Sequence, residues 1–279
     1  GGNWLVKGAH TIGTQLRLSP LLIGLTIVAF GTSAPELIVN LIASYYKQPD
    51  IVFGNIIGSN IANILLILGC SGIIYPLSIH AKQLKKELLY TILFPLVFLV
   101  LLLVTPPVLT LTMIKSLLLL ALFIYFLVTL IFGNNATPYL EAPVKSTRGG
   151  AYILLGSGII LLPIGGHLVV NSASSIALSC GISEAVVSLL AIAIGTSLPE
   201  LAASIIASIH HDTDIAIGNI LGSNIFNIGL ILSVSGLVSP LVFSPLLMGH
   251  LIFLIAISSL FPLVIFLKKS PSLTRVESA

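Results

Sequence analysis

The chain has 279 residues, of which 56% are hydrophobic and 8% are charged, and its mean hydropathy is +1.13. This composition excludes an ordinary soluble domain, in which about a quarter of the residues are charged. The net charge of +3 is small and the cations lie at the ends of apolar runs, which excludes a nucleic-acid-binding surface.

The apolar runs predict membrane-spanning helices. Backbone polar groups in a bilayer must be satisfied within the protein, so only a helical bundle or a closed barrel can span it. Residues 88–104 and 117–132 lack the alternation of a barrel strand, which favours helices. A spanning helix needs about 20 residues, and in chain order we expect spans near 1–16, 20–46, 51–75, 86–105, 108–132, 149–179, 184–209, 214–238 and 245–267.

An internal repeat divides the chain. The segment GTSAPEL at 31–37 returns as GTSLPEL at 195–201, which is 164 positions later. At the same offset GNIIGSNIANI at 54–64 aligns without a gap with GNILGSNIFNI at 218–228. The long polar connection at 133–148 lies between the copies. We therefore expect a first half at 1–132, a connecting loop at 133–148 and a second half at 149–279.

The repeat also predicts the topology. By the offset, Gly1 aligns with Gly165 inside the sixth span, and residues 108–132 would align with positions 272–296, most of which lie beyond Ala279. We expect a parent of five plus five spans, of which about nine are present here, with span one incomplete and the last one missing. Five is an odd number, so the second half must enter the membrane from the opposite side, which gives an inverted repeat.

The charges suggest an orientation. Assigning the turns after odd-numbered spans to one side of the membrane gathers nine of the 12 lysines and arginines there. By the positive-inside rule that side is cytoplasmic. These nine are Arg17, Lys82, Lys85, Lys86, Lys145, Arg148, Lys268, Lys269 and Arg275.

Two acidic residues stand apart from the other seven. Glu36 and Glu200 lie inside predicted spans at repeat-related positions, where an unpaired charge costs about 2.5 to 3.5 kcal/mol. An inverted repeat brings such positions together near the midplane, so we expect both carboxylates to face one site. The other acidic residues lie in predicted loops or at span ends: Asp50, Glu87, Glu141, Glu184, Asp212, Asp214 and Glu277.

Oxygen-bearing side chains accompany the glutamates. Thr32 and Ser33 lie four and three residues before Glu36, on the same face of a helix. The second half repeats this arrangement with Thr196, Ser197 and Glu200. On the next helix of each half a polar stripe recurs every four residues, formed by Asn55, Ser59 and Asn63 and by Asn219, Ser223 and Asn227. Such oxygens are the ligands of hard cations such as Ca²⁺, which takes 6 to 8 of them.

Prolines near the glutamates predict kinks. Pro35 and Pro199 have no N–H, so they leave the carbonyls of Gly31 and Gly195 without the usual helical donor. We expect kinked helices with backbone oxygens available to a cation.

Other features have simpler interpretations. Gly54 and Gly58, like their counterparts Gly218 and Gly222, suit close helix packing. Asn60 and Asn224 could equally bind a neighbouring helix or line the site. The turn containing His210, His211, Asp212 and Asp214 is expected to be solvated and not a metal site.

The paired motifs GTSAPEL with GNIIGSNIANI, and GTSLPEL with GNILGSNIFNI, closely resemble the two alpha-repeats of the cation/calcium exchanger superfamily, nearest its prokaryotic sodium/calcium exchanger branch. Proton/calcium exchangers of the superfamily usually show GN-x-x-E where this chain has GTS-x-P-E. The resemblance implies a bundle of spans one and six that slides across a rigid core.

The resemblance also implies roles for individual residues. Glu36 and Glu200 would bind both Ca²⁺ and Na⁺, Thr32 and Thr196 would join the calcium site, and Ser33 and Ser197 the sodium sites. Ser59, Asn63, Ser223, Asn227 and the carbonyls of Ala29 and Ala193 would complete the ligands. Several relatives carry aspartate where this chain has Asn227, and in potassium-dependent members that acid is tied to K⁺ use. We therefore expect no K⁺ requirement.

The leading hypothesis is a secondary antiporter that exchanges Ca²⁺ for Na⁺ by alternating access. The alternatives are a Ca²⁺/H⁺ antiporter and a passive cation channel built on the same carboxylates. We expect no enzyme activity, no cofactor and no nucleic-acid partner, since no nucleophile with a partnered base and no phosphate-binding glycine loop is visible. The partners would be Ca²⁺, Na⁺ and lipid in a prokaryotic inner membrane, and the oligomeric state stays open.

Overall fold

The computed structural model describes residues 1–78, 84–104, 108–133, 148–181, 195–267 and 272–273. The first half contains α1 (Gly2–Gln15), α2 (Pro20–Ile23), α3 (Ala29–Thr32), α4 (Ala34–Tyr45), α5 (Pro49–Ala62), α6 (Leu68–Ile74), β1 (Leu77–Ser78), α7 (Lys85–Leu103), β2 (Thr110–Leu111) and α8 (Met113–Gly133). The second contains α9 (Arg148–Ser179), α11 (Leu198–Ile209), α12 (Thr213–Phe226), α13 (Ser233–Val238), β3 (Leu241–Val242), a short turn of 3₁₀-helix at Pro245–Leu247, α14 (Met248–Leu267) and β4 (Ser272–Leu273).

Membrane-spanning helices dominate the described residues, as the sequence predicts. Six helices are long and apolar enough to cross a membrane, or seven if the bent pair Pro20–Thr32 and Ala34–Tyr45 is one span. The expected count of nine is not reached in this part of the chain. The first expected span is a helix of 14 residues, and the seventh is described only from residue 195 and contains the 12 residues of α11. Of the expected connecting loop, residues 134–147 are outside the described part of the chain, whereas Gly133 ends α8 and Arg148 begins α9.

The expected kink at the proline takes a different form. The helix stops at Thr32, Ser33 forms the break, and α4 starts at Ala34 with Pro35 in its first turn. The two pieces are bent by 46°. In the first turn of a helix a proline is tolerated, because its missing N–H would have no partner there. The second half repeats the start of the second piece, with α11 starting after Ser197 and Pro199 in its first turn.

The helix α12, with its continuation to Val238, forms the centre of the bundle and is almost entirely buried. Glycine lets it approach the first half closely. A Cβ atom on Gly218 would lie 2.6 Å from the Leu21 carbonyl oxygen, and one on Gly222 would lie 2.7 Å from the Ala29 Cβ. The packing interpretation is therefore confirmed for these two glycines. For Gly54 and Gly58 no described atom lies within 4 Å of such a Cβ, so their role stays a prediction.

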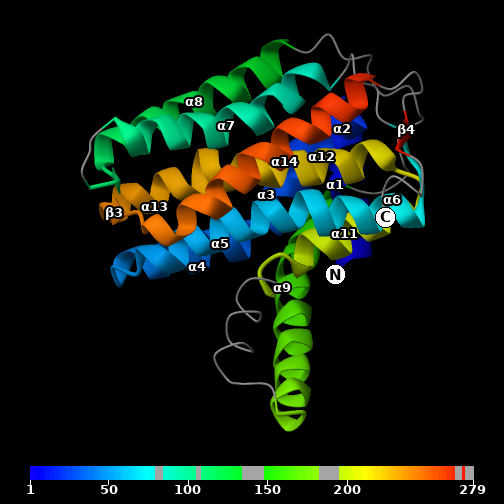
Figure 1. Ribbon diagram of the computed structural model, residues 1–279. Coiled ribbons are helices and arrows are strands. Elements are labelled where there is room, and N and C mark those ends of the chain that lie inside the picture. Colours follow the sequence, from blue (N-terminus) through cyan, green and yellow to red (C-terminus); the bar gives the residue numbers. More distant parts are fainter. Residues whose placement is uncertain (79–83, 105–107, 134–147, 182–194, 268–271, 274–279) are drawn as a thin grey trace.

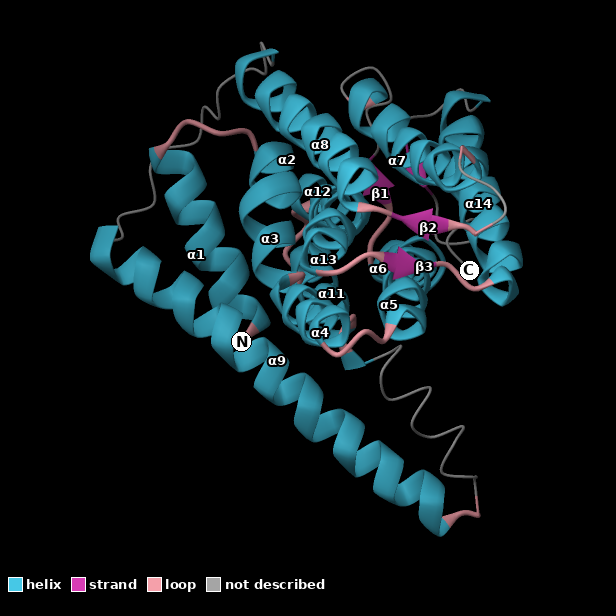
Figure 2. Ribbon diagram, turned by 90° about the vertical axis from the view of Figure 1, so that its left-hand side faces the viewer, coloured by secondary structure: helices cyan, strands magenta, loops and turns pink. Residues whose placement is uncertain are grey.

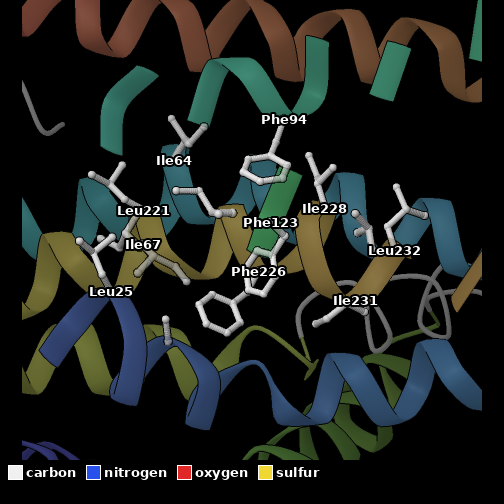
Figure 3. Packing of buried hydrophobic residues seen from close by; sticks show 14 of the residues in the cluster. Leu25, Ile64, Ile67, Phe94, Phe123, Leu221, Phe226, Ile228, Ile231 and Leu232 are labelled. Carbon is white, nitrogen blue, oxygen red and sulfur yellow. The ribbon is translucent and has the colours of Figure 1, made fainter. Parts of the chain in front are cut away.

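Aromatic side chains fill the space between α12 and the helices that cover it. Figure 3 shows Phe94 of α7, Phe123 of α8 and Phe226 of α12 meeting in one apolar layer. The ring centroids of Phe123 and Phe226 are 5.0 Å apart in an edge-to-face arrangement, which suits the quadrupoles of the rings. This layer holds α7 and α8 against the central helix.

The helices α1 and α9 form a separate pair beside this bundle, and the distal part of α9 extends away from it (Figure 1; Figure 2). The two helices run antiparallel, because Gly1 approaches Leu162 whereas Gly8 approaches Ala151 and Leu155. Repeat-related helices that run in opposite directions are what an inverted repeat requires.

Two small antiparallel sheets join the halves. Leu77 of β1 pairs with Leu273 of β4, and Leu241 of β3 pairs with Leu111 of β2. Leu77 and Leu241 are 164 positions apart, so the two sheets are themselves related by the repeat. The chain is thus an inverted-repeat helix bundle, as its sequence predicts.

Candidate cation site

The two intramembrane glutamates lie in the first turns of α4 and α11, just after the breaks at Ser33 and Ser197. Each is only 1% exposed. The N-terminal end of a helix carries a partial positive charge, which favours a carboxylate at this position. Ser33, three residues before Glu36 in the chain, hydrogen-bonds to Glu200, which places the start of α4 beside the carboxylate of the other half. The structure therefore brings together two buried negative groups from opposite halves of the chain.

Serine hydroxyls link the halves around these carboxylates. The Ser33 hydroxyl donates to Glu200 Oε1 at 3.0 Å, and it also lies 3.1 Å from the Ser223 hydroxyl. The repeat-related contact joins Ser197 to Ser59 at 3.1 Å. The break in each half thus contacts the polar stripe of the other half.

Threonine and asparagine form a second pair of links. The Thr32 hydroxyl donates to Asn219 Oδ1 at 3.1 Å. In the repeat-related pair the direction is reversed, because Asn55 Nδ2 donates to the Thr196 hydroxyl at 2.9 Å. The two partners of each pair lie more than 100 residues apart in the sequence.

Four asparagines continue the polar layer between α5 and α12. Asn63 Nδ2 donates to Asn224 Oδ1 at 2.9 Å, and the repeat-related Asn227 Nδ2 donates to Asn60 Oδ1 at 2.8 Å. Asn60 Nδ2 donates in addition to the Asn224 carbonyl at 3.2 Å. Asn60 and Asn224 therefore bind the partner helix, which was one of the two interpretations of their sequence. Asn63 and Asn227 each begin a π-helical turn, a distortion that is frequent at functional sites.

Among the described predicted ligands, five buried side-chain oxygens have no hydrogen-bond partner. They belong to four of the predicted ligands and are both carboxylate oxygens of Glu36, Oε2 of Glu200, Oδ1 of Asn63 and Oδ1 of Asn227. Buried oxygens without a donor are rare, because desolvation without a partner is costly. All five are hard oxygen acceptors, the type that Ca²⁺ and other hard cations prefer. The donor set therefore fits a dehydrated cation.

Eleven of the 12 predicted ligand residues are described, and all of them are buried: Ala29, Thr32, Ser33, Glu36, Ser59, Asn63, Thr196, Ser197, Glu200, Ser223 and Asn227. The twelfth, Ala193, lies outside the described residues. The Ala29 carbonyl accepts hydrogen bonds from the Ser33 N–H at 3.0 Å and from the Thr32 hydroxyl at 3.3 Å. The Ala29 carbonyl oxygen therefore already accepts two hydrogen bonds from the residues at the break.

Two features of the structure were not foreseen from the sequence. Asn40 is fully buried beside the Glu36 backbone, and its Nδ2 donates to the Glu36 carbonyl at 2.7 Å. Its spacing of four residues from Glu36 on the same helical face was a signal that could have identified it. Glu87 was assigned to a span end, and it does lie in the first turn of α7, but it is only 2% exposed.

Glu87 does not belong to the candidate site. It lines a small cavity between α7 and α8 with Tyr90, Phe126 and Thr129. None of the predicted ligands takes part in that cavity. Glu87 is therefore a buried carboxylate outside the site, which makes it a useful reference for the two glutamates.

Another cavity, of about 500 Å³, lies between α1, α9 and the turn after α11. It is lined by Lys7, His10, Thr11, His210 and Asp212, with Val6 and Leu154. Within the described ranges, no group of three His, Cys, Asp or Glu residues is arranged to hold a metal ion.

Comparison with known proteins identifies the family. The family model described as sodium/calcium exchanger protein matches residues 1–132 and 150–279. The chain belongs to the sodium/calcium exchanger family. The chain is therefore a cation/calcium exchanger and a multi-pass integral membrane protein. Members of the family are transporters, not enzymes.

Several relatives of this exchanger have names that match this assignment. It is 40% identical to the putative antiporter CaxA of Alkalimonas amylolytica, over 84% of this chain and 75% of the relative. It is 37% identical to the inner membrane protein YrbG of Escherichia coli, over 87% and 77%. It is 31% identical to the sodium/calcium exchanger MaX1 of Methanosarcina acetivorans, over 86% and 80%.

A solved structure extends the similarity to three dimensions. The sodium-calcium exchanger NCX_Mj, soaked with 2.5 mM Na⁺ and 0.1 mM Ca²⁺, superposes on this exchanger with a TM-score of 0.81 and 33% sequence identity. The match covers 99% of this chain and 88% of that one. The same arrangement of helices is thus found in a protein whose ion exchange has been studied in crystals.

Proposed function

We propose that this exchanger moves Ca²⁺ in exchange for Na⁺ by alternating access, and that the cations bind between Glu36 and Glu200. The observation that carries the proposal is the set of five buried oxygens without partners, which belong to Glu36, Asn63, Glu200 and Asn227. They come from both halves of the chain, and a cation between them would remove the cost of their desolvation.

The charges explain why the two ions would compete. Two carboxylates carry a charge of −2, which one Ca²⁺ or two Na⁺ would neutralise, and a third Na⁺ would leave a charge of +1. With no cation bound, two ionised carboxylates buried in a medium of low dielectric constant would repel each other. If only the loaded site can move across the membrane, the flux of one ion is coupled to that of the other.

The proposed ligands follow the resemblance and are consistent with the contacts. Thr32 and Thr196 would join the calcium site, and Ser33 and Ser197 the sodium sites. Ser59, Ser223, Asn63 and Asn227 would line the centre. Since positions 63 and 227 are both asparagine, we propose that transport needs no K⁺.

Transport in proteoliposomes tests the driving ion. A Na⁺ gradient is imposed at constant pH, and a pH gradient is then imposed without Na⁺, while the uptake of radiolabelled Ca²⁺ is followed. Uptake driven by Na⁺ alone supports the proposal. Uptake driven by the pH gradient alone would replace Na⁺ by H⁺ as the coupling ion, whereas single-channel currents without countertransport would indicate a passive channel.

The cellular location is also proposed from the relatives. Two of the bacterial and archaeal relatives are named as membrane proteins, and the Escherichia coli one is named as an inner membrane protein. We propose the inner membrane of a prokaryotic cell, with the side that gathers nine lysines and arginines facing the cytoplasm. Cysteine labelling from outside the cell at Gln48 and at Leu16 tests this orientation, since only Gln48 should react.

A further inference from the structure

The two halves of the site differ at a buried polar position. Asn40 and Ser204 are repeat-related, 164 positions apart, and both side chains are fully buried. Asn40 Nδ2 donates to Asn55 Oδ1 at 2.7 Å. In the other half the direction is reversed, because Ser204 accepts at 2.9 Å from Asn219 Nδ2.

This difference sets the orientation of two side-chain amides. Asn55 turns its oxygen toward Asn40, so its nitrogen faces Thr196. Asn219 turns its nitrogen toward Ser204 and the Glu200 carbonyl, so its oxygen faces Thr32. An amide has its donor and its acceptor at opposite corners, so the group that binds one corner decides what the other offers.

The amide orientation changes the chemistry of the two threonines. A hydroxyl has one proton to donate and two lone pairs to accept with. Thr32 is the donor toward Asn219 Oδ1 and toward the Ala29 carbonyl, which share its one proton. Its lone pairs therefore remain for a cation. Thr196 accepts the N–H of Asn55, which occupies one lone pair and directs a positive hydrogen at the oxygen.

We infer that Asn40 is a positioning residue that makes the two halves of the cation site unequal. By turning Asn55, it weakens the Thr196 hydroxyl as a ligand and leaves the Thr32 hydroxyl as the stronger one. This inference rests on the proposed binding of cations between Glu36 and Glu200. A cation held nearer to Thr32 than to Thr196 would interact unequally with the two carboxylates, although the sequence motifs around them are nearly the same.

The second half shows what a substitution at position 40 would do. In N40S the new hydroxyl can accept from Asn55 Nδ2, as Ser204 accepts from Asn219. Asn55 would then turn its oxygen toward Thr196, and the Thr196 hydroxyl would no longer accept from an amide N–H. The two halves of the site would become chemically equivalent.

Valine has nearly the shape of threonine but lacks the hydroxyl, so valine substitutions measure how much each hydroxyl contributes to Ca²⁺ affinity. Calcium affinity is determined by titration calorimetry on the purified full chain with T32V and T196V, in the natural background and in N40S. In the natural background T32V should weaken Ca²⁺ binding about tenfold more than T196V, a factor that corresponds to about 1.4 kcal/mol. In N40S the two valine variants should weaken binding equally.

The inference is overturned if T32V and T196V have equal effects in the natural background, or if their difference persists in N40S. The first comparison needs no change at Asn40, so it decides the matter even if N40S fails to fold. A merely structural role of Asn40 would lower the unfolding temperature without altering the ratio of the two valine effects. E36Q and E200Q in the same assay test the site itself, because unchanged Ca²⁺ binding there would reject the proposed function and not only the inequality.

Discussion

The Ser33 hydroxyl donates a hydrogen bond of 3.0 Å to the Glu200 carboxylate, although the two residues are 167 positions apart in the chain. The repeat-related Ser197 contacts the Ser59 hydroxyl at 3.1 Å. The break in the first half is therefore tied directly to the carboxylate of the second. A relative movement of the two halves would change the surroundings of that carboxylate, which is what coupling between ion binding and conformation requires.

Replacing either intramembrane glutamate by glutamine should lower Ca²⁺ affinity about 100-fold or more. Removing one member of a buried charged set costs about 3 to 5 kcal/mol, and each 1.4 kcal/mol is a factor of ten. Titration calorimetry on E36Q and E200Q measures the loss. E87Q is the matched control, because Glu87 is also a buried carboxylate with an unpartnered oxygen but lies between α7 and α8. Equal losses in all three variants would contradict the assignment.

Ser33→Ala should weaken Na⁺ competition against Ca²⁺ by about tenfold. The substitution removes a proposed sodium ligand and a hydrogen bond to a charged group, which is worth about 1.5 to 3 kcal/mol. The concentration of Na⁺ that halves Ca²⁺ binding measures the effect. S71A serves as the control, since it removes a buried hydroxyl without a partner from α6. A comparable effect of S71A would mean that general packing, and not the site, sets Na⁺ affinity.

Asn227→Asp should make Ca²⁺ transport depend on an additional monovalent cation. A third carboxylate raises the charge of the site to −3, and aspartate cannot donate to Asn60 Oδ1 as Asn227 does at 2.8 Å. Calcium uptake by proteoliposomes with and without K⁺ measures this dependence. N227A loses the same hydrogen bond without adding charge, so K⁺ stimulation in N227A would show that charge is not the cause.

Gly158→Ala should destabilise the pair formed by α1 and α9. A Cβ atom at position 158 would lie 2.5 Å from the Leu5 backbone nitrogen, and overpacking of this kind costs about 1 to 3 kcal/mol. Gly156, two residues away on the same helix, has no described atom within 4 Å of such a Cβ. Gly156→Ala should therefore be neutral or slightly stabilising. Thermal unfolding in detergent compares the two, and an equal fall in both unfolding temperatures would refute the close contact.

The inverted helix bundle could be predicted from the sequence because its signals are local and strong. Apolar runs near 20 residues long define most spans, and the repeated motifs around Glu36 and Glu200 define the symmetry. The breaks were harder to predict. A proline indicates that a helix is interrupted nearby, but whether Pro35 kinks a helix or begins a new one depends on the neighbours of Ser33.

The sequence by itself predicted which residues form the candidate site, because buried carboxylates are costly in a membrane and therefore point to function. Only the tertiary structure decided how they are connected. Hydrogen-bond direction depends on every neighbour in a buried network, and no spacing in the chain reveals that Asn40 turns Asn55 while Ser204 turns Asn219 the other way. Two halves with nearly the same motifs thus differ in the direction of their hydrogen bonds around the candidate site.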